Sequence, residues 1–302
     1  MSPIRKKTVV FHVGAHKTGT SLLQKFMRDN NTTLRRNRIY YLSRSAMNDY
    51  VGWGDKLLND PEPLARKMRQ TLLIPWFNVL IASHENTLGR PLRKGGAHLY
   101  PRAPEVIDAL GALLEHHRPK IFFSIRPQEQ FLESYYLQSI HEGRHQTFQE
   151  WLDKIDLDAL SWKPVVDALR ATFGAEQVEI IDFRSIKQGQ QAYVRQFFTR
   201  IDPRYSFEIE YSAMRNPSIS DKGLQMALAA NPHLNSGEER KLMRKFLQKH
   251  FSNTRYPRPV LFSGDQRRAL HDRYEGEYEA LVGGPRVIDG GTADVTEAAP
   301  RR

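Results

Sequence analysis

The sequence predicts an α/β protein, with a parallel β-sheet flanked by helices and a mostly helical C-terminal region. Short apolar runs rich in β-branched and aromatic residues alternate with amphipathic helical patterns over residues 8–183, an order typical of parallel sheets. From residue 190 onwards the periodicity is mostly helical. We expect one domain over residues 1–282 and disorder over 283–302, where Gly, Pro and Ala dominate.

The first strand is predicted at Thr8–Val13, a short β-branched and aromatic run. The helix behind it should begin near residue 20, because its apolar side chains recur on one helical face. Later strands are expected at residues 38–42, 78–82, 120–125 and 178–183. Later helices are expected at residues 61–73, 104–117, 128–142, 190–200, 221–230, 237–251 and 265–282.

Composition narrows the class of partner. The chain has 302 residues and 40% hydrophobic content, enough for a sizeable core. Its formal net charge of +11 favours an anionic partner such as a nucleotide, an acidic glycan, nucleic acid or an anionic membrane surface. The absence of cysteine excludes disulfides and thiol nucleophiles. With no apolar run of about 20 residues and no secretory leader, we expect a soluble cytoplasmic protein.

The loop after the first strand is predicted to bind phosphate or sulfate. Gly14, Gly19 and Ser21 have the spacing of the triphosphate-binding signature G-x-x-x-x-G-K-[ST]. Thr20 occupies the position of the signature's lysine, and the loop's own lysine is Lys17. A strand, a glycine-bearing loop and a helix N-terminus still aim backbone N–H groups at one anion. The sequence therefore indicates an anion site without the geometry of an ATPase.

A second candidate anion site follows the strand predicted at residues 120–125. Arg126 stands at the end of this strand, and Ser134 comes eight residues later in the next predicted helix. Parallel sheets bind ligands beyond the carboxyl ends of their strands. A guanidinium and a hydroxyl at that edge can converge on one phosphate.

Together the two constellations resemble those of sulfotransferases that use 3′-phosphoadenosine-5′-phosphosulfate (PAPS). The family's loop for the 5′-phosphosulfate, Lys-x-Gly-Thr-[Thr/Ser], is matched by residues 17–21, and its Arg and Ser pair for the 3′-phosphate by Arg126 and Ser134. Residues 216–220 and 262–268 look more weakly like the C-terminal helical region of bacterial members. The specific resemblance covers residues 8 to about 140.

The resemblance implies a P-loop-type fold and transfer of a sulfuryl group from PAPS to a hydroxyl or amine, with no metal required. Lys17 would stabilise charge on the departing 5′-phosphate. Arg126 and Ser134 would select PAPS over ordinary adenine nucleotides. The other residues implied in donor binding are His16, Thr18, Gly19, Thr20 and Ser21. His16 is a third candidate for the base, but we favour a role in packing the loop or contacting the phosphate.

A general base is expected just after the strand at residues 78–82, where His84 and Glu85 are adjacent. Many glycan sulfotransferases place a glutamate at the end of this strand, whereas the cytosolic small-molecule branch uses a histidine nearby. Consecutive residues leaving a strand point in different directions, so we expect one of the two to face the donor. We favour Glu85 over His84.

The sequence leaves two alternative functions open. A P-loop nucleotide kinase is disfavoured by Thr20, and a non-catalytic anion or nucleic-acid binding protein by the lack of a recognised nucleic-acid module. We expect no nucleic-acid partner and no metal site. The acceptor is expected to be a glycan or glycolipid ahead of a small phenol, which leaves peripheral membrane contact open. Its pocket is expected to involve residues 48–60, residues 89–102 and the C-terminal helices.

Overall fold

The computed structural model describes residues 7–92, 98–205 and 217–283. Five strands form one sheet in the order β2-β3-β1-β4-β5, and every pair is parallel. The strands are β1 (Thr8–His12), β2 (Ile39–Leu42), β3 (Val79–Ser83), β4 (Arg118–Ile125) and β5 (Val178–Asp182). The predicted α/β class with a parallel sheet is confirmed, and each strand lies within two residues of its predicted bounds.

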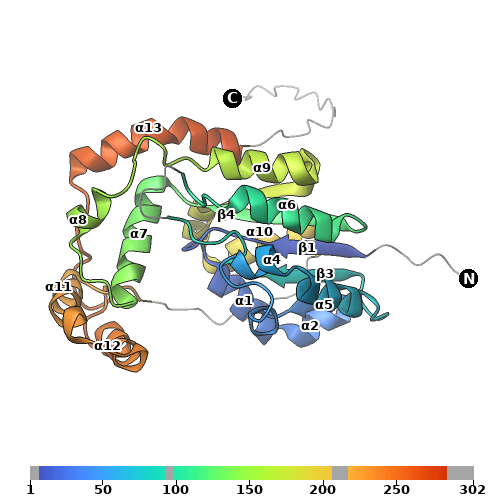
Figure 1. The fold of residues 1–302 in the computed structure, drawn as a ribbon, viewed down its shortest axis with the longest axis horizontal. Coiled ribbons are helices and arrows are strands. Elements are labelled where there is room, and N and C mark those ends of the chain that lie inside the picture. The colour runs from blue at the N-terminus through green and yellow to red at the C-terminus, as the bar shows by residue number, and fades with distance from the viewer. Residues whose placement is uncertain (1–6, 93–97, 206–216, 284–302) are drawn as a thin grey trace, which may run out of the picture.

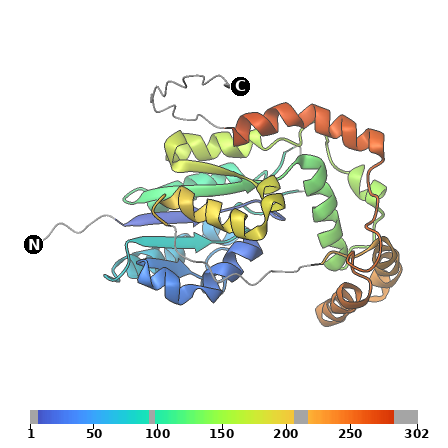
Figure 2. The ribbon, with the colours of Figure 1, turned by 180° about the vertical axis from the view of Figure 1, so that it is seen from behind.

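Helices cover both faces of the sheet (Figure 1, Figure 2). The longer ones are α1 (Thr20–Asp29), α5 (Glu62–Leu72), α6 (Ala103–Leu114), α7 (Gln128–His141), α9 (Lys163–Phe173), α10 (Gln190–Ile201), α11 (Asp221–Ala230), α12 (Gly237–His250) and α13 (Gly264–Val282). The short ones are α2 (Asn31–Arg36), α3 (Arg44–Met47), α4 (Asp55–Asn59) and α8 (Phe148–Leu152). The chain from α10 onwards is mostly helical, as predicted.

Two apolar clusters separate the faces of the sheet. One contains Val10, Ile81 and Phe122 from the strands and packs against α1 and α10, as Phe26 and Phe198 illustrate with ring centroids 5.4 Å apart. The larger cluster contains alternate strand residues and the buried faces of α4, α5, α6, α7, α9 and α13. Both faces of every central strand are therefore buried, which explains their continuous apolar runs.

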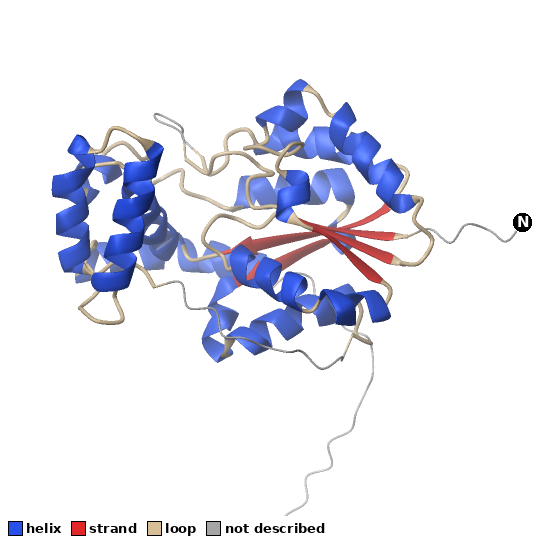
Figure 3. Ribbon diagram, turned by 90° about the horizontal axis from the view of Figure 1, so that it is seen from below, coloured by secondary structure: helices blue, strands red, loops and turns tan. Residues whose placement is uncertain are grey.

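The helices α11 and α12 lie at one end of the sheet rather than on its faces (Figure 3). Ile219 and Ser252 form an antiparallel bridge that joins the segments before α11 and after α12. Side-chain caps begin both helices: Ser220 accepts from the Gly223 N–H, and Ser236 forms a capping box with Glu239. This end of the molecule faces the carboxyl edge of the sheet, where α7 departs from β4.

The helix α9 is absent from the sequence-based prediction. Pro164 lies in the first turn of α9, where its missing N–H removes no helical hydrogen bond. Three predicted features fall wholly or partly outside the described residues: Asn216, the middle of the loop at 89–102, and the tail after Gly283.

Candidate active site at the carboxyl edge of the sheet

The loop between β1 and α1 is fixed to the neighbouring strand β4. The backbone N–H groups of Val13 and Ala15 donate to carbonyls of β4 at 3.0 Å each. The Thr18 hydroxyl then closes a tight turn by donating to the Ala15 carbonyl. Lys17 and Gly19 adopt positive φ angles of 66° and 82°. A lysine in this conformation is uncommon, so the loop holds Lys17 at some cost in backbone energy.

The N-terminus of α1 presents unused hydrogen-bond donors. Its N-cap is Gly19, no side chain caps the first turn, and that turn contains no acidic residue. The Thr20 hydroxyl is buried and has no hydrogen-bond partner within the described residues. Free N–H groups, the positive end of the helix dipole and an orphaned hydroxyl together favour a bound anion.

A cavity of about 640 Å³ opens over this helix N-terminus. The predicted residues that line it are His16, Lys17, Gly19, Thr20, Ser21, Glu85, Arg126 and Ser134. Thr18 and His84 are buried and are not among the described lining residues. The opposite wall includes Gln138 and His141 of α7 and Arg244 and Gln248 of α12. Segments far apart in the sequence therefore meet at the carboxyl edge of the sheet.

Lys17 projects into this cavity, where its side chain remains exposed to solvent. Protein atoms nevertheless surround it on most sides, and this desolvation lowers the pKa of its ammonium group to about 8. The positive charges of Arg126 and Arg244 lower that pKa further, while Glu142 and Glu85 raise it. An anion in the cavity would relieve the repulsion among these cations.

Arg126 lies beside the loop and is held on three sides. One terminal nitrogen donates to the Lys17 carbonyl at 3.2 Å, and the guanidinium carbon lies 5.0 Å from the Phe183 ring centroid. The Arg126 carbonyl accepts from the Trp162 indole N–H at 2.8 Å. Its Nε is buried without a partner in the described structure, which leaves a donor for a ligand. Burial lowers the pKa of Arg126.

His16 is engaged on all of its polar atoms. The Tyr100 hydroxyl accepts from the His16 backbone N–H at 2.8 Å and lies 2.7 Å from Nδ1. The His16 Nε2 lies 3.0 Å from the Asn86 side-chain oxygen, so Nε2 carries the proton and Nδ1 accepts from Tyr100. Burial lowers the pKa of His16 to about 4. The ring is neutral at pH 7 and supports the loop.

His84 is likewise occupied. Its Nδ1 accepts from the Asn86 backbone N–H at 3.2 Å, and its Nε2 donates to the Asn48 side-chain oxygen at 3.0 Å. The ring is 1% exposed, and burial followed by the charge of Arg44 lowers its pKa to about 4. In this arrangement neither ring nitrogen is open to a substrate in the cavity.

Glu85 lines the cavity with its carboxylate. One oxygen lies 2.5 Å from a terminal nitrogen of Arg44, and the other accepts from the Gln24 amide at 3.3 Å. The Glu85 side chain is 15% exposed, so it keeps access to the cavity. Arg44 and Gln24 therefore fix the orientation of the carboxylate.

A buried polar network beneath the loop has no counterpart in the sequence-based prediction. His12 lies between two serines of the neighbouring strands, with Nδ1 2.9 Å from the Ser83 hydroxyl and Nε2 3.3 Å from the Ser124 hydroxyl. The Tyr193 hydroxyl, from α10, lies 3.3 Å from Ser124 and donates to the Thr18 carbonyl at 2.8 Å. Burial lowers the pKa of His12 to about 4, so the network contains a neutral imidazole. It braces the underside of the loop between β1 and α1.

The cavity also contains cationic and polar side chains that sequence patterns do not single out. Arg44 follows β2, and Arg244 belongs to the basic face of α12. The His141 Nδ1 is buried without a hydrogen-bond partner in the described structure. A cluster of lysine and arginine residues on α12 is visible in the sequence, but its spacing alone reads as a solvated face.

Within residues 7–92, 98–205 and 217–283, no group of three or more His, Cys, Asp or Glu side chains could hold a metal ion. In the same part of the chain, no helix combines the length and apolar character needed to cross a membrane.

Comparison with known proteins finds similarity in structure but not in sequence. No family model matches the chain, and no curated protein matches its sequence. Among solved structures, the chain is similar to the crystal structure of a sulfotransferase from Alicyclobacillus acidocaldarius, with 19% sequence identity and a TM-score of 0.44. The match covers 76% of this chain and 98% of that one. Similarity at this level does not establish a shared activity, so the function is inferred from the site itself.

Proposed function

We propose that this protein is a sulfotransferase that moves a sulfuryl group from PAPS to a hydroxyl or amine of an acceptor. The observation that carries the proposal is the meeting of Lys17 and Arg126 at one cavity over an uncapped helix N-terminus. Two buried donors there, on Thr20 and Arg126, have no partner within the described residues. A ligand with two anionic groups satisfies both.

The fit to PAPS rests on these donors. The backbone N–H groups at the start of α1, with the hydroxyls of Thr20 and Ser21, would hold the 5′-phosphosulfate. Arg126 and Ser134 would hold the 3′-phosphate, since both line the same cavity. When bound, PAPS supplies a sulfuryl group on a phosphosulfate anhydride. Thr18 would contribute only its backbone N–H group, because its hydroxyl already donates to the Ala15 carbonyl.

Lys17 acts in its protonated form. Negative charge builds on the 5′-phosphate as the anhydride breaks, and an ammonium group fixed in a partly desolvated cavity stabilises that charge without reorganising. Loss of one such preorganised donor costs roughly 10²- to 10³-fold in kcat. Because Lys17 is exposed and lines the cavity, a substitution here should remove charge without removing core packing.

Glu85 is the general base in this proposal. Its carboxylate lines the cavity and can accept the acceptor's proton, while Arg44 and Gln24 hold its orientation. His84 would not accept the acceptor's proton, since its two ring nitrogens are already hydrogen-bonded to Asn86 and Asn48.

The proposed contact between Arg126 and the 3′-phosphate can be tested by substitution. We expect Arg126→Gln to weaken binding of adenosine 3′,5′-bisphosphate by about 10- to 100-fold, the loss of a charge-assisted contact, and to leave 5′-AMP binding nearly unchanged. Calorimetric titration of both nucleotides measures the ratio. Arg66→Gln, on the exposed face of α5, is the matched control for loss of one charge. Equal weakening of both nucleotides would contradict the assignment.

A further inference from the structure

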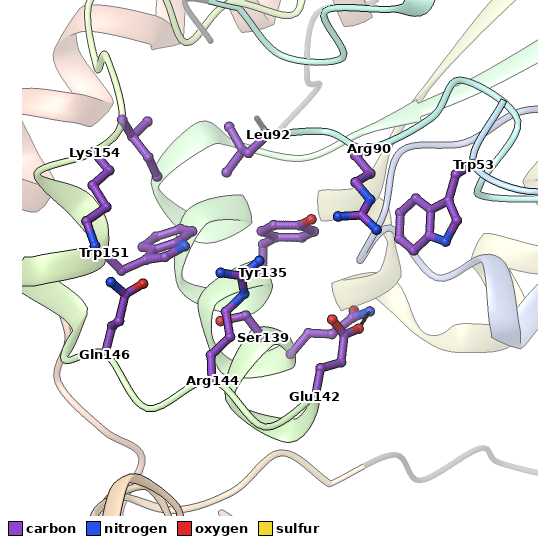
Figure 4. Close-up of a pocket in the computed structure, with 12 residues that line it drawn as sticks. Trp53, Arg90, Leu92, Tyr135, Ser139, Glu142, Arg144, Gln146, Trp151 and Lys154 are labelled. Carbon is purple, nitrogen blue, oxygen red and sulfur yellow. Dashed lines mark hydrogen bonds between the residues drawn. The ribbon is translucent and has the colours of Figure 1, made fainter. Parts of the chain in front are cut away.

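A second cavity, of about 380 Å³, adjoins the first (Figure 4). Trp53, Gln138 and Glu142 line both cavities, so the two share a wall. The remaining lining comes from the loop at Arg90 and Leu92, from α7, and from the segment that carries α8. A molecule in the second cavity would therefore lie next to the groups around Lys17.

The lining of this second cavity carries surplus positive charge. Arg90, Arg144 and Lys154 line it, all three are exposed, and none forms an ion pair within the described part of the chain. Among the described lining residues, the one acidic group is Glu142, whose carboxylate accepts from the Gln138 amide at 3.0 Å. Three cations against one carboxylate favour an anionic ligand.

Aromatic rings also line the same cavity. Figure 4 shows the Tyr135 ring between Trp151 on one side and the Arg90 guanidinium and Trp53 on the other. Tyr135 is held in place by stacking on Phe131, with ring centroids 5.6 Å apart. Rigid aromatic faces give contact area at little entropic cost, and they suit the C–H faces of sugar rings.

Polar groups between the rings distinguish a saccharide from a phenol. Gln138, Ser139 and Gln146 line the cavity, whereas the aliphatic side chains among its described lining residues are those of Leu92 and Ile155. The Ser139 hydroxyl already donates to the Tyr136 carbonyl at 2.7 Å, so the amides of Gln138 and Gln146 supply the donors and acceptors for ligand hydroxyls. A small phenol would leave most of these amide groups unpaired. The lining thus matches a ring that carries many hydroxyl groups and a negative charge.

Trp53 lies at the wall between the cavities and has an unusual backbone conformation. It has a φ of 52°, and Gly54 after it has a φ of 74°. A Cβ on Gly54 would lie 2.8 Å from the Thr87 carbonyl oxygen, so the turn can close only with glycine there. The indole stacks on His16 at a centroid distance of 5.2 Å, and the Arg90 guanidinium carbon lies 5.3 Å from the indole. Strain held at such a position points to a binding role.

We propose that the second cavity binds the acceptor and that the acceptor is an anionic saccharide. This inference rests on the proposed function, because the shared wall places such a ligand beside the donor site. The rings of Tyr135 and Trp151 contact the sugar, while Arg90, Arg144 and Lys154 bind its acidic groups.

The test uses the full chain and two probes of equal length. Unsulfated chondroitin tetrasaccharide carries carboxylates, and chitotetraose is neutral. We expect wild-type protein to bind the acidic probe at least about tenfold more tightly at low ionic strength, and Arg144→Gln/Lys154→Gln to remove about tenfold of that affinity. Arg66→Gln/Arg195→Gln is the control, because it removes the same charge from exposed positions on α5 and α10. The control should bind both probes as wild type does.

The outcomes separate the two proposals. Adenosine 3′,5′-bisphosphate is titrated into every variant, and its affinity should stay within about twofold of wild type, since neither double variant touches the residues around Lys17. Equal binding of the two saccharides, no binding of either, or equal losses in the two double variants would overturn the anionic-saccharide site. Failure of the bisphosphate to bind wild-type protein would instead overturn the proposed function.

Discussion

The charge state of Lys17 makes anion binding depend on pH above neutrality. Desolvation, followed by the charges of Arg126 and Arg244, lowers the pKa of this lysine to about 8. The protonated form attracts a phosphate and the neutral form does not, so affinity should be full below this pKa and fall above it. An ordinary lysine would stay charged up to about pH 10.

The size of the effect follows from the titration. With a pKa of about 8, Lys17 is about nine-tenths protonated at pH 7 and about one-tenth protonated at pH 9. The affinity for adenosine 3′,5′-bisphosphate should therefore fall by up to about tenfold between these pH values, or about 1.4 kcal/mol. Phosphate groups, with a second pKa near 6, are almost fully ionised throughout. Burial lowers the pKa values of His16, His84 and His141 to about 4, so these rings stay neutral.

The assay is calorimetric titration of the bisphosphate at pH 7, 8 and 9 and constant ionic strength. The control is Lys17→Arg, which stays charged over this range and should give a nearly flat profile. Thermal unfolding at each pH checks that the protein remains folded. A wild-type affinity that does not change between pH 7 and 9, or an equal fall in Lys17→Arg, would refute the reasoning.

Three further predictions follow from the site and its support. Lys17→Met should lower turnover of labelled PAPS by roughly 10²- to 10³-fold with an unchanged melting temperature, and near-wild-type turnover would remove the lysine from the mechanism. Glu85→Gln should lower turnover while bisphosphate affinity stays within about twofold, and a large loss of affinity would assign Glu85 to binding instead. Gly14→Ala should lower the free energy of unfolding by about 1–3 kcal/mol, because its Cβ would lie 2.7 Å from Nε2 of buried His12. Chemical denaturation measures this loss, and Gly237→Ala, whose Cβ would meet nothing within 4 Å, should cost less than about 0.5 kcal/mol.

The parallel sheet could be predicted from the sequence because burial on both faces leaves continuous apolar runs. The run at Val9–Phe11 and the one at Val79–Ala82 are each buried along their whole length. The helix α9 is absent from the sequence-based prediction, although a proline in the first turn is a common helix-start signal and Pro164 lies there. What α9 packs against is a tertiary fact: the indole of Trp162, just before the helix, donates to the Arg126 carbonyl.

The candidate site, like the fold, has parts that the sequence predicts and parts that it does not. The loop around Lys17 and the position of Arg126 follow from local patterns, because each comes directly after a predicted strand. The network under the loop does not, since Tyr193 is 175 positions from the Thr18 carbonyl that it contacts. Arg44 beside Glu85 is equally a product of folding, and a lone arginine after a strand carries no local signal. Contacts of this range depend on how α10 and β2 pack, which periodicity does not specify.

The central claim is that the cavity over α1 selects an adenine nucleotide with a 3′-phosphate. Calorimetric titration of wild-type protein with adenosine 3′,5′-bisphosphate, and separately with ATP and Mg²⁺, tests it most directly. We predict that the bisphosphate binds without added metal and at least about tenfold more tightly than ATP, because Arg126 has a free donor for the additional phosphate. Tight binding of ATP with Mg²⁺ and no binding of the bisphosphate would contradict the account and favour a nucleotide kinase.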